Sequence, residues 1–405
     1  MRDQLRDRTR RFGCKCCIWL LLLWGCVPQP VREPPRESRF ERLSVDQWPA
    51  LHDDMDLILL EQAIEKSLLF YQKIPRDRTF PLGEIEISAA RLQETLVLFL
   101  DHLKSGKVDP VSLSRSFDLF GIRPDPGKDG PLVTGYYEPV LDASLKLDDV
   151  FRHPIYSLPP DLVTVDLRSF DPDKFPPGER LVGRLQENRL IPYFTRLEID
   201  GEGKLENSDC HLAWLKDPVD VFFLHIQGSG VLRLPDGTER RVGYAGTNGR
   251  PYRSVGKYLI ERGFLPAEGI SMQVIKDFLK AHPELRQEVL GHNESYVFFR
   301  WVQEGPVGSL NVVLTEGRSI ATDPQFHPRG GLAFLETTRP RVSKEGKWVG
   351  TEPLSRWVLN QDAGGAIKGI GRVDLFCGTG ETAEWTAGRM KYPGRIYFLL
   401  KKQPL

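Results

Sequence analysis

Three aspartates in the last quarter of the chain are the residues best suited to do chemistry. Asp323, Asp362 and Asp374 each lie in or at the end of an apolar segment with glycines close by. Glycine allows a ligand or another backbone to approach closely. If residues 372–378 form a strand, Asp374 projects from one face beside Phe376. A carboxyl group among apolar neighbours has its pKa raised by desolvation, as a general acid requires.

Each aspartate also has a simpler structural interpretation. Asp323 precedes Pro324, a common turn initiator, and Asp362 precedes two glycines and can accept hydrogen bonds from its own turn. Taken singly, either residue is better explained as part of a turn. Three such aspartates within 52 residues favour a shared site.

Other chemistries fit the same residues less well. Asp323, Asp362, Asp374 and His327 could supply metal ligands, but no His-x-x-His spacing occurs, and no Cys-x-x-Cys spacing occurs beyond residue 26, so we expect no metal. An aspartic-protease pair needs two carboxylates sharing a proton, and the Asp-Ala-Gly sequence at 362–364 occurs once. The Gly-Ser-Gly sequence at 228–230 does not fit a nucleophile elbow.

The amino terminus predicts export. A basic segment precedes a short apolar run at 16–25, too short to span a bilayer, which takes about 20 residues. Residues 1–25 are therefore expected to be a signal peptide. The Gly-Cys step resembles the site where bacterial lipoproteins are cleaved and acylated, which makes Cys26 the lipidated residue. Residues 26–44, rich in proline, are expected to be an extended tether. Val27 after the cysteine favours the outer membrane.

The rest of the chain has the composition of a globular, β-rich protein. Its 405 residues exceed one ordinary core, so we expect two domains. The formal net charge is +0, and since the leader is basic the remainder is mildly acidic, which argues against a nucleic-acid partner. Of the six cysteines only Cys210 and Cys377 lie beyond the leader, and a disulfide between them is possible but not required.

Hydrophobic periodicity predicts a mainly β fold with peripheral helices. Apolar residues at helical spacing predict helices at 55–75, 88–106, 254–263 and 271–290. Short apolar runs between Gly, Pro and Asp predict strands at 132–141, 190–199, 220–234, 294–302 and 310–315.

Several segments together resemble the membrane-bound lytic murein transglycosylase A family. They are DAGGAIKGIGRVDLFCG at 362–378, TGYYEP at 134–139, PYFTRLEI at 192–199, the stretch 222–256, NESYVFFR at 293–300 and GRSIATDP at 317–324. The resemblance covers most of residues 130–400 in the family's order. It implies a double-psi β-barrel domain from 45–139 and 291–405, which contains the family's three-aspartate region at about 310–400. A second β domain, 140–290, is inserted into it, with the substrate groove between the two.

The resemblance also implies the reaction and the site. Such enzymes cleave the β-1,4 bond between N-acetylmuramic acid and N-acetylglucosamine without water and leave 1,6-anhydromuramyl ends. Asp374 is then the acid and base, Asp362 and Asp323 support it, and no cofactor is expected. The implied partners are peptidoglycan glycan strands and, through the lipid anchor, the membrane. The residues expected to contact sugar are Thr134, Tyr136 and Tyr137 on one wall, Gln227, Gly228 and Ser229 on the other, and Lys368.

Two alternatives remain open at this point. Glu138 is a second acid near the expected groove. With Glu138 or Asp362 as partner, Asp374 could instead serve a peptidoglycan or β-glucan hydrolase. The other alternative is a cell-wall-binding lipoprotein without activity.

Overall fold

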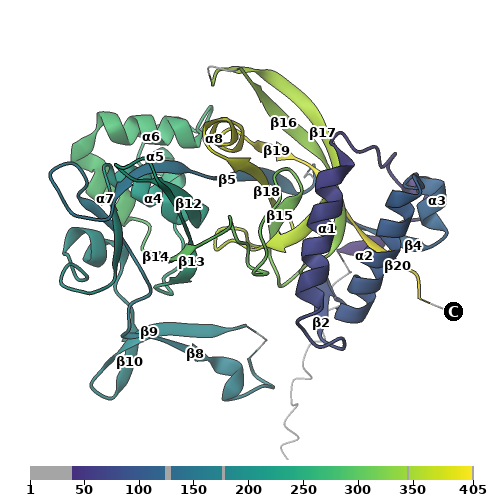
Figure 1. The fold of residues 1–405 in the computed structure, drawn as a ribbon, viewed down its shortest axis with the longest axis horizontal. Helices are drawn as coiled ribbons and strands as arrows, with labels where there is room; N and C mark the ends of the chain where they lie inside the picture. Colours follow the sequence, from purple (N-terminus) through teal and green to yellow (C-terminus); the bar gives the residue numbers. More distant parts are fainter. Residues whose placement is uncertain (1–38, 124–128, 176–177, 344–345, 404–405) are drawn as a thin grey trace, which may run out of the picture. The chain divides into compact units, whose positions relative to one another are not determined.

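The computed structural model describes residues 39–123, 129–175, 178–343 and 346–403 (Figure 1). The expected signal peptide, Cys26 and most of the expected tether lie outside these residues. The end of the tether is not extended linker as we predicted. Residues Phe40–Arg42 form strand β1, which pairs antiparallel with β4, and Phe40 is buried because it packs on the ring of Phe398.

A nine-stranded mixed sheet carries the three aspartates. Its order is β1-β4-β20-β16-β17-β15-β18-β5-β19, so both ends of the chain contribute strands. Two neighbouring pairs, β15 with β17 and β18 with β5, are parallel. The strands beyond β1 are β4 (Phe117–Ile122), β20 (Arg395–Lys401), β16 (Leu332–Val342), β17 (Trp348–Asp362), β15 (Ser319–Thr322), β18 (Arg372–Thr379), β5 (Leu132–Glu138) and β19 (Lys391–Pro393).

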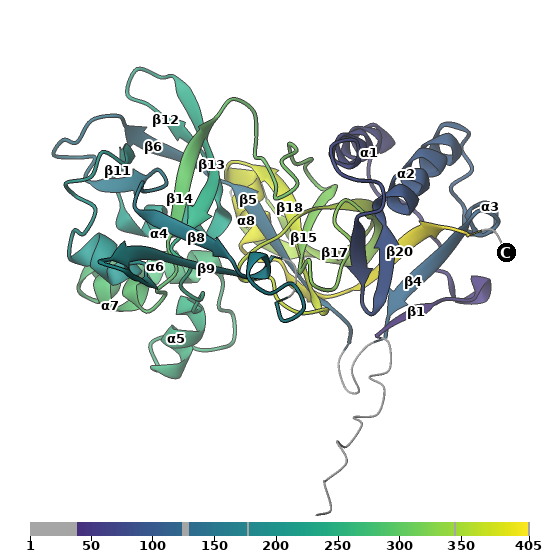
Figure 2. The same ribbon diagram turned by 90° about the horizontal axis from the view of Figure 1, so that it is seen from below.

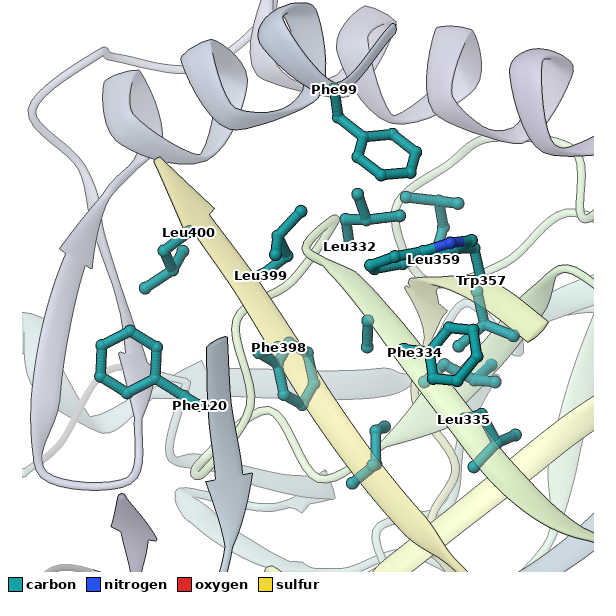
Figure 3. Close-up of a cluster of buried hydrophobic side chains, with 14 of the residues drawn as sticks. Phe99, Phe120, Leu332, Phe334, Leu335, Trp357, Leu359, Phe398, Leu399 and Leu400 are labelled. Carbon is teal, nitrogen blue, oxygen red and sulfur yellow. The ribbon is translucent and has the colours of Figure 1, made fainter. Parts of the chain in front are cut away.

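Two predicted helices, α1 (Leu57–Tyr71) and α2 (Ala89–Lys104), pack on this sheet and enclose its main core. Each begins at a capping residue, Asp56 or Ser88, whose side chain accepts a hydrogen bond from a first-turn amide. Figure 3 shows the ring of Phe99, from α2, pointing toward Trp357 on β17, with ring centroids 4.8 Å apart. This core fixes β17, whose last residue is Asp362. A short helix, α3 (Pro110–Ser114), precedes β4.

A second, six-stranded sheet has the order β14-β13-β12-β6-β11-β7 (Figure 2). Helix α4 (Pro218–Gln227) contributes Val221 and Leu224 to its core. Its strands are β14 (Val297–Val302), β13 (Glu239–Thr247), β12 (Ser229–Arg233), β6 (Val140–Ser144), β11 (His211–Leu215) and β7 (His153–Tyr156). Helices α5 (Val255–Glu261), α6 (Met272–Ala281) and α7 (Arg286–Gly291) pack with α4. A three-stranded sheet is formed by β10 (Arg189–Pro192), β9 (Arg180–Gln186) and β8 (Leu162–Asp166), and a hairpin by β2 (Thr79–Leu82) and β3 (Ile85–Ser88).

Three strand predictions and one expected domain boundary differ from the structure. Residues 220–227, predicted as part of a strand, lie in helix α4. Asp217 caps the first turn of this helix, Pro218 is its first residue, and Gly228, with φ 78°, ends it. The prediction was wrong because an apolar run alone does not distinguish a buried helix from a strand. Residues 190–199 hold β10 followed by a π-helical turn at Leu197–Gly201. Residues 310–315 form a loop with one isolated bridge, Val307 to Val313. Strand β14 pairs with β13, although we had expected 291–405 to belong with the barrel.

The mainly β class is confirmed, with helices around the sheets. The predicted helices at 55–75, 88–106 and 254–263 are present, and 271–290 is divided into α6, a short 3-10 turn and α7. Within the part of the chain that the structure describes, none of the helices is both long and apolar enough to cross a membrane.

Candidate active site

Strand register brings two of the three aspartates to one sheet face. Asp374 on β18 lies opposite Thr134 on β5 and opposite Ala321 on β15. Asp362, the last residue of β17, lies opposite Ala321 from the other side. The two aspartates are therefore two strands apart, about 10 Å at the backbone from the spacing of neighbouring strands.

Asp374 is held by the residue opposite it. The Thr134 hydroxyl donates a hydrogen bond of 2.7 Å to Oδ1 of Asp374, and Nη2 of Arg372 approaches the same hydroxyl at 3.5 Å. Burial raises the pKa of Asp374 to about 7, although the Thr134 bond and the Arg372 charge oppose the rise. The residue keeps some solvent contact, since its exposure is intermediate. Near neutral pH it can both give and take a proton, which a general acid and base must do.

Asp362 has both carboxylate oxygens engaged. The Tyr136 phenol donates to Oδ2 at 3.0 Å, and the backbone amides of Ser309 and Ala363 donate to Oδ1 at 2.8 Å each. Burial raises the pKa of Asp362, and these three hydrogen bonds lower it. Because Tyr136 starts from β5, its ring crosses the face that carries Asp374. Asp362 therefore fixes the ring of Tyr136 beside the acid.

Asp323, the residue after β15, holds a loop. Its side chain is 2% exposed, and its Oδ2 accepts a 2.7 Å hydrogen bond from the amide of Gly369. Gly369 belongs to the loop 363–371, which joins β17 to β18 and thus Asp362 to Asp374. Lys368 lies exposed on this loop. Within the described ranges, no three His, Cys, Asp or Glu side chains gather as metal ligands would.

Some of the residues expected to contact sugar lie on the sheet face that carries Asp374, and others are buried in the protein interior. Thr134 and Tyr136 lie on the face with Asp374, as predicted. Tyr137 points the other way and is 1% exposed, because it packs on Ala383 and Ala387 of α8 (Glu381–Ala387). Because Tyr137 also lines a cavity beside Thr134, a sugar contact by this residue stays a prediction.

The three residues expected on the opposite wall lie at the end of α4. Oε1 of Gln227 accepts a 3.0 Å hydrogen bond from the amide of Tyr137, so α4 is tied directly to β5. Gly228 ends the helix in the left-handed conformation, and Ser229 starts β12 with its side chain buried. Gln227 is thus close to the strand that carries Thr134, whereas sugar contacts by all three residues stay a prediction.

Glu138, the second acid considered above, is enclosed. It is 0% exposed, accepts a 2.8 Å hydrogen bond from the Thr379 hydroxyl and lies 3.5 Å from Nε of Arg241. Burial raises the pKa of Glu138 and these two partners lower it. A carboxyl group without solvent access does not face a substrate. Cys210 and Cys377 are both free thiols, so the possible disulfide is not formed.

A cavity of about 1030 Å³ opens beside Thr134. Gln227 and Thr134 line it, and Asp374 does not. Five aromatic residues that we did not predict for the site also line it, namely Phe222, Phe223, Tyr252, Trp348 and Tyr392. Tyr252 lies close enough to Arg372 for that charge to lower its pKa, against a rise caused by burial. The cavity therefore adjoins the Asp374 site at Thr134.

Comparison with known proteins gives the family. Residues 132–300 match the model of the MltA specific insert domain, and residues 318–400 match that of the 3D domain. The membrane-bound lytic murein transglycosylase A of Vibrio cholerae is 30% identical over 396 residues, which cover 94% of this chain and 92% of that protein. The chain belongs to the membrane-bound lytic murein transglycosylase A family. Its reaction class is that of a lytic murein transglycosylase, an enzyme that cleaves peptidoglycan.

Solved structures agree with this membership in the lytic murein transglycosylase A family. A membrane-bound lytic murein transglycosylase from Agrobacterium tumefaciens has 33% sequence identity and a TM-score of 0.73, covering 89% of this chain and 97% of that one. The Escherichia coli MltA structure with bound chitohexaose has a TM-score of 0.67 and 24% identity, covering 92% of this chain and 98% of that one. Because only 24% of its residues are identical, the Escherichia coli structure shows a similarity of fold alone.

Proposed function

We propose that this chain cleaves the β-1,4 bond between N-acetylmuramic acid and N-acetylglucosamine without water, with Asp374 as acid and then base. The observation that carries the proposal is the half-buried Asp374 carboxyl group, whose pKa of about 7 lets it exist in both protonation states. A pKa near the working pH is the condition under which one group serves both steps.

The steps follow from one carboxyl group and a substrate with its own alcohol. Protonated Asp374 donates to the glycosidic oxygen as the bond from C1 of the muramyl ring breaks, and the N-acetylglucosamine residue leaves with a hydroxyl group. The C6 hydroxyl oxygen then bonds to C1, and the Asp374 carboxylate accepts its proton, which restores the acid. Because the attacking hydroxyl is already part of the sugar, no water has to be positioned.

The other carboxyl groups support a single-acid mechanism. Inverting hydrolases hold two free carboxyl groups about 6.5–9.5 Å apart, with a water activated by one of them. Asp362, two strands from Asp374, has both oxygens occupied by Tyr136, Ser309 and Ala363. Glu138 is fully buried. Neither carboxylate has a free oxygen facing substrate, which favours the lytic reaction over hydrolysis.

The proposal extends to the remaining family features. The connectivity of the nine-stranded sheet is consistent with a double-psi barrel that receives residues from both ends of the chain, with the six-stranded sheet inserted and the glycan held between them. We also propose that Cys26 carries a lipid that anchors the enzyme to the periplasmic face of the outer membrane. The Gly25-Cys26 step after a basic, apolar leader supports this anchor, as do relatives named as membrane-bound.

The test is digestion of purified sacculi by the wild type, Asp374→Asn and Glu138→Gln, with products identified by mass spectrometry. We expect anhydromuramyl ends from the wild type, none from Asp374→Asn, and release by Glu138→Gln within about threefold of the wild type, less than about 0.7 kcal/mol. Reducing ends would instead indicate a hydrolase, and binding to sacculi without any products would indicate a wall-binding protein.

A further inference from the structure

Arg372 is a charged residue on the catalytic face to which the proposed reaction assigns no part. It lies two residues before Asp374 on β18, so alternation along the strand directs both side chains to the same face. At this spacing their backbones are about 6.6–6.8 Å apart. Arg372 and Asp374 are both half-buried, whereas Val373 between them lies in the core. The guanidinium group therefore lies beside the acid, on the face that the substrate must approach.

The charge of Arg372 lacks a counter-ion. Its Nη2 atom approaches the Thr134 hydroxyl at 3.5 Å, a long hydrogen bond, and the residue opposite it on β5 is the apolar Leu132. In the part of the chain that the structure describes, Arg372 forms no ion pair with a carboxylate. Its charge lowers the pKa of Asp374, but Asp374 accepts its hydrogen bond from Thr134 instead. A half-buried guanidinium group with most of its donors unused is suited to bind an anionic group of a ligand.

The two sugars of peptidoglycan differ in one such group. N-acetylmuramic acid carries a lactyl ether at C3 that ends in a carboxyl group, whereas N-acetylglucosamine carries a hydroxyl there. A single ring atom separates C3 from the reacting C1, so this carboxyl group lies within one sugar ring of the bond that Asp374 protonates. Arg372 has the matching position and charge, and its planar guanidinium group can bind a carboxylate through two parallel hydrogen bonds.

We infer that Arg372 is a specificity-determining residue that binds the lactyl carboxyl group of the muramyl residue at the cleaved bond. The inference rests on the proposed function, since it requires a muramyl ring at Asp374. When a stem peptide is attached, this group is an amide, whose carbonyl oxygen accepts hydrogen bonds but carries no full negative charge. The free carboxylate binds Arg372 more tightly, so glycan strands without stem peptides are the preferred substrate. The reaction that supplies them is hydrolysis of the amide between the lactyl group and the peptide.

The test is calorimetric binding in the Asp374→Asn background, in which nothing is cut. The ligands are a tetrasaccharide of alternating N-acetylglucosamine and N-acetylmuramic acid with free lactyl carboxylates, and the same tetrasaccharide with these carboxylates converted to amides. Asp374→Asn should bind the carboxylate form about tenfold more tightly, the lower end for a hydrogen bond to a charged group because the site is half exposed. With Arg372→Met added, the two forms should bind within about twofold of each other. Arg372→Lys keeps the charge without the planar group and should recover part of the preference.

A ligand without the lactyl group shows whether Arg372 acts on that group alone. Chitohexaose should bind Asp374→Asn equally well with and without Arg372→Met. An equal loss of affinity for chitohexaose and for the carboxylate form would indicate a general structural role and would overturn the inference. A carboxylate preference that survives Arg372→Met would also overturn it.

Two other cations serve as comparisons. Arg115 is an exposed arginine that follows the last residue of α3, and Lys368 lies exposed on the loop 363–371. Arg115→Gln and Lys368→Gln, each in the Asp374→Asn background, should both keep the ratio of affinities between the two forms. If Lys368→Gln abolished the preference and Arg372→Met did not, the carboxylate would belong to the loop and the inference would be wrong.

Cleavage assays separate this inference from the proposed function. Loss of the Arg372 charge should raise the pKa of Asp374 for both substrates alike, so only the ratio of the two KM values reports on the lactyl group. That ratio should fall about tenfold in Arg372→Met. If the wild type released no anhydromuramyl ends, the proposed function would fail while the binding comparison would still decide the role of Arg372. If the wild type released them but Asp374→Asn bound both forms equally, the inference alone would fail.

Discussion

The hydroxyl of Thr134 should set the pH range of the enzyme, and its removal tests the reasoning about Asp374. The hydroxyl donates to Oδ1 of Asp374 at 2.7 Å and so stabilises the ionised carboxylate. A hydrogen bond to a charged group is worth about 1.5–3 kcal/mol, and about 1.4 kcal/mol corresponds to one pH unit. Thr134→Val, which removes the donor and keeps the shape, should therefore raise the pKa of Asp374 by about one to two units.

The assay is the pH dependence of kcat/KM for release of anhydromuramyl products, which reports the free enzyme. Because the first step needs the protonated acid, wild-type activity should fall as the pH rises through about 7. In Thr134→Val this fall should move upward by about one to two pH units. Thr134→Ser keeps the donor and should follow the wild-type profile. A fall at the same pH in Thr134→Val and the wild type would refute the account of Asp374.

Three further predictions concern stability and the loop. The pKa of Asp374 is about 7 in the folded protein, above its value in the unfolded chain, so ionisation of this group destabilises the fold as the pH rises from about 4 to 7. Asp374→Asn should therefore be more stable than the wild type at pH 8 but not at pH 4. The gain at pH 8 should be at most about 4 kcal/mol, measured by urea unfolding. Asp323→Ala leaves the Gly369 amide without its acceptor, at a cost of about 1–3 kcal/mol, and should speed hydrogen exchange in the peptide 363–371; unchanged exchange there would contradict the loop-holding role. Asp53 makes hydrogen bonds of 2.6 and 2.9 Å to the fully buried Arg318, so Asp53→Ala should cost about 3–5 kcal/mol in urea unfolding, whereas the exposed Asp46→Ala should cost little.

Alternation along one strand was enough to predict the face of Asp374. The sequence of β18 alternates apolar and functional residues, and the structure has Asp374 on the face that Thr134 and Tyr136 share. The same alternation places Tyr136 and Tyr137 on opposite faces of β5, yet we predicted sugar contacts for both residues. Since neighbours on a strand face opposite sides, Tyr137 belongs to the core with α8.

The division of roles among the aspartates could not be read from the sequence. All three have the same local pattern, an acid beside apolar residues and glycine. What distinguishes them is long-range, since Asp323 meets an amide 46 residues away and Asp362 meets a phenol 226 residues away. Likewise, α4 is a helix because of its caps at Asp217 and Gly228, while the uniformly apolar run between them fits a strand equally well.

Gln227 ties the two sheets together at one point next to the acid. Its side-chain oxygen accepts a hydrogen bond from the backbone amide of Tyr137 on β5, one residue past Tyr136 and three past Thr134. We therefore expect a shift of α4 to displace the part of β5 that carries the Thr134 hydroxyl, the donor to Asp374. A bound glycan strand that separates the two sheets should then also change the pKa of Asp374, because the Thr134 hydrogen bond lowers that pKa.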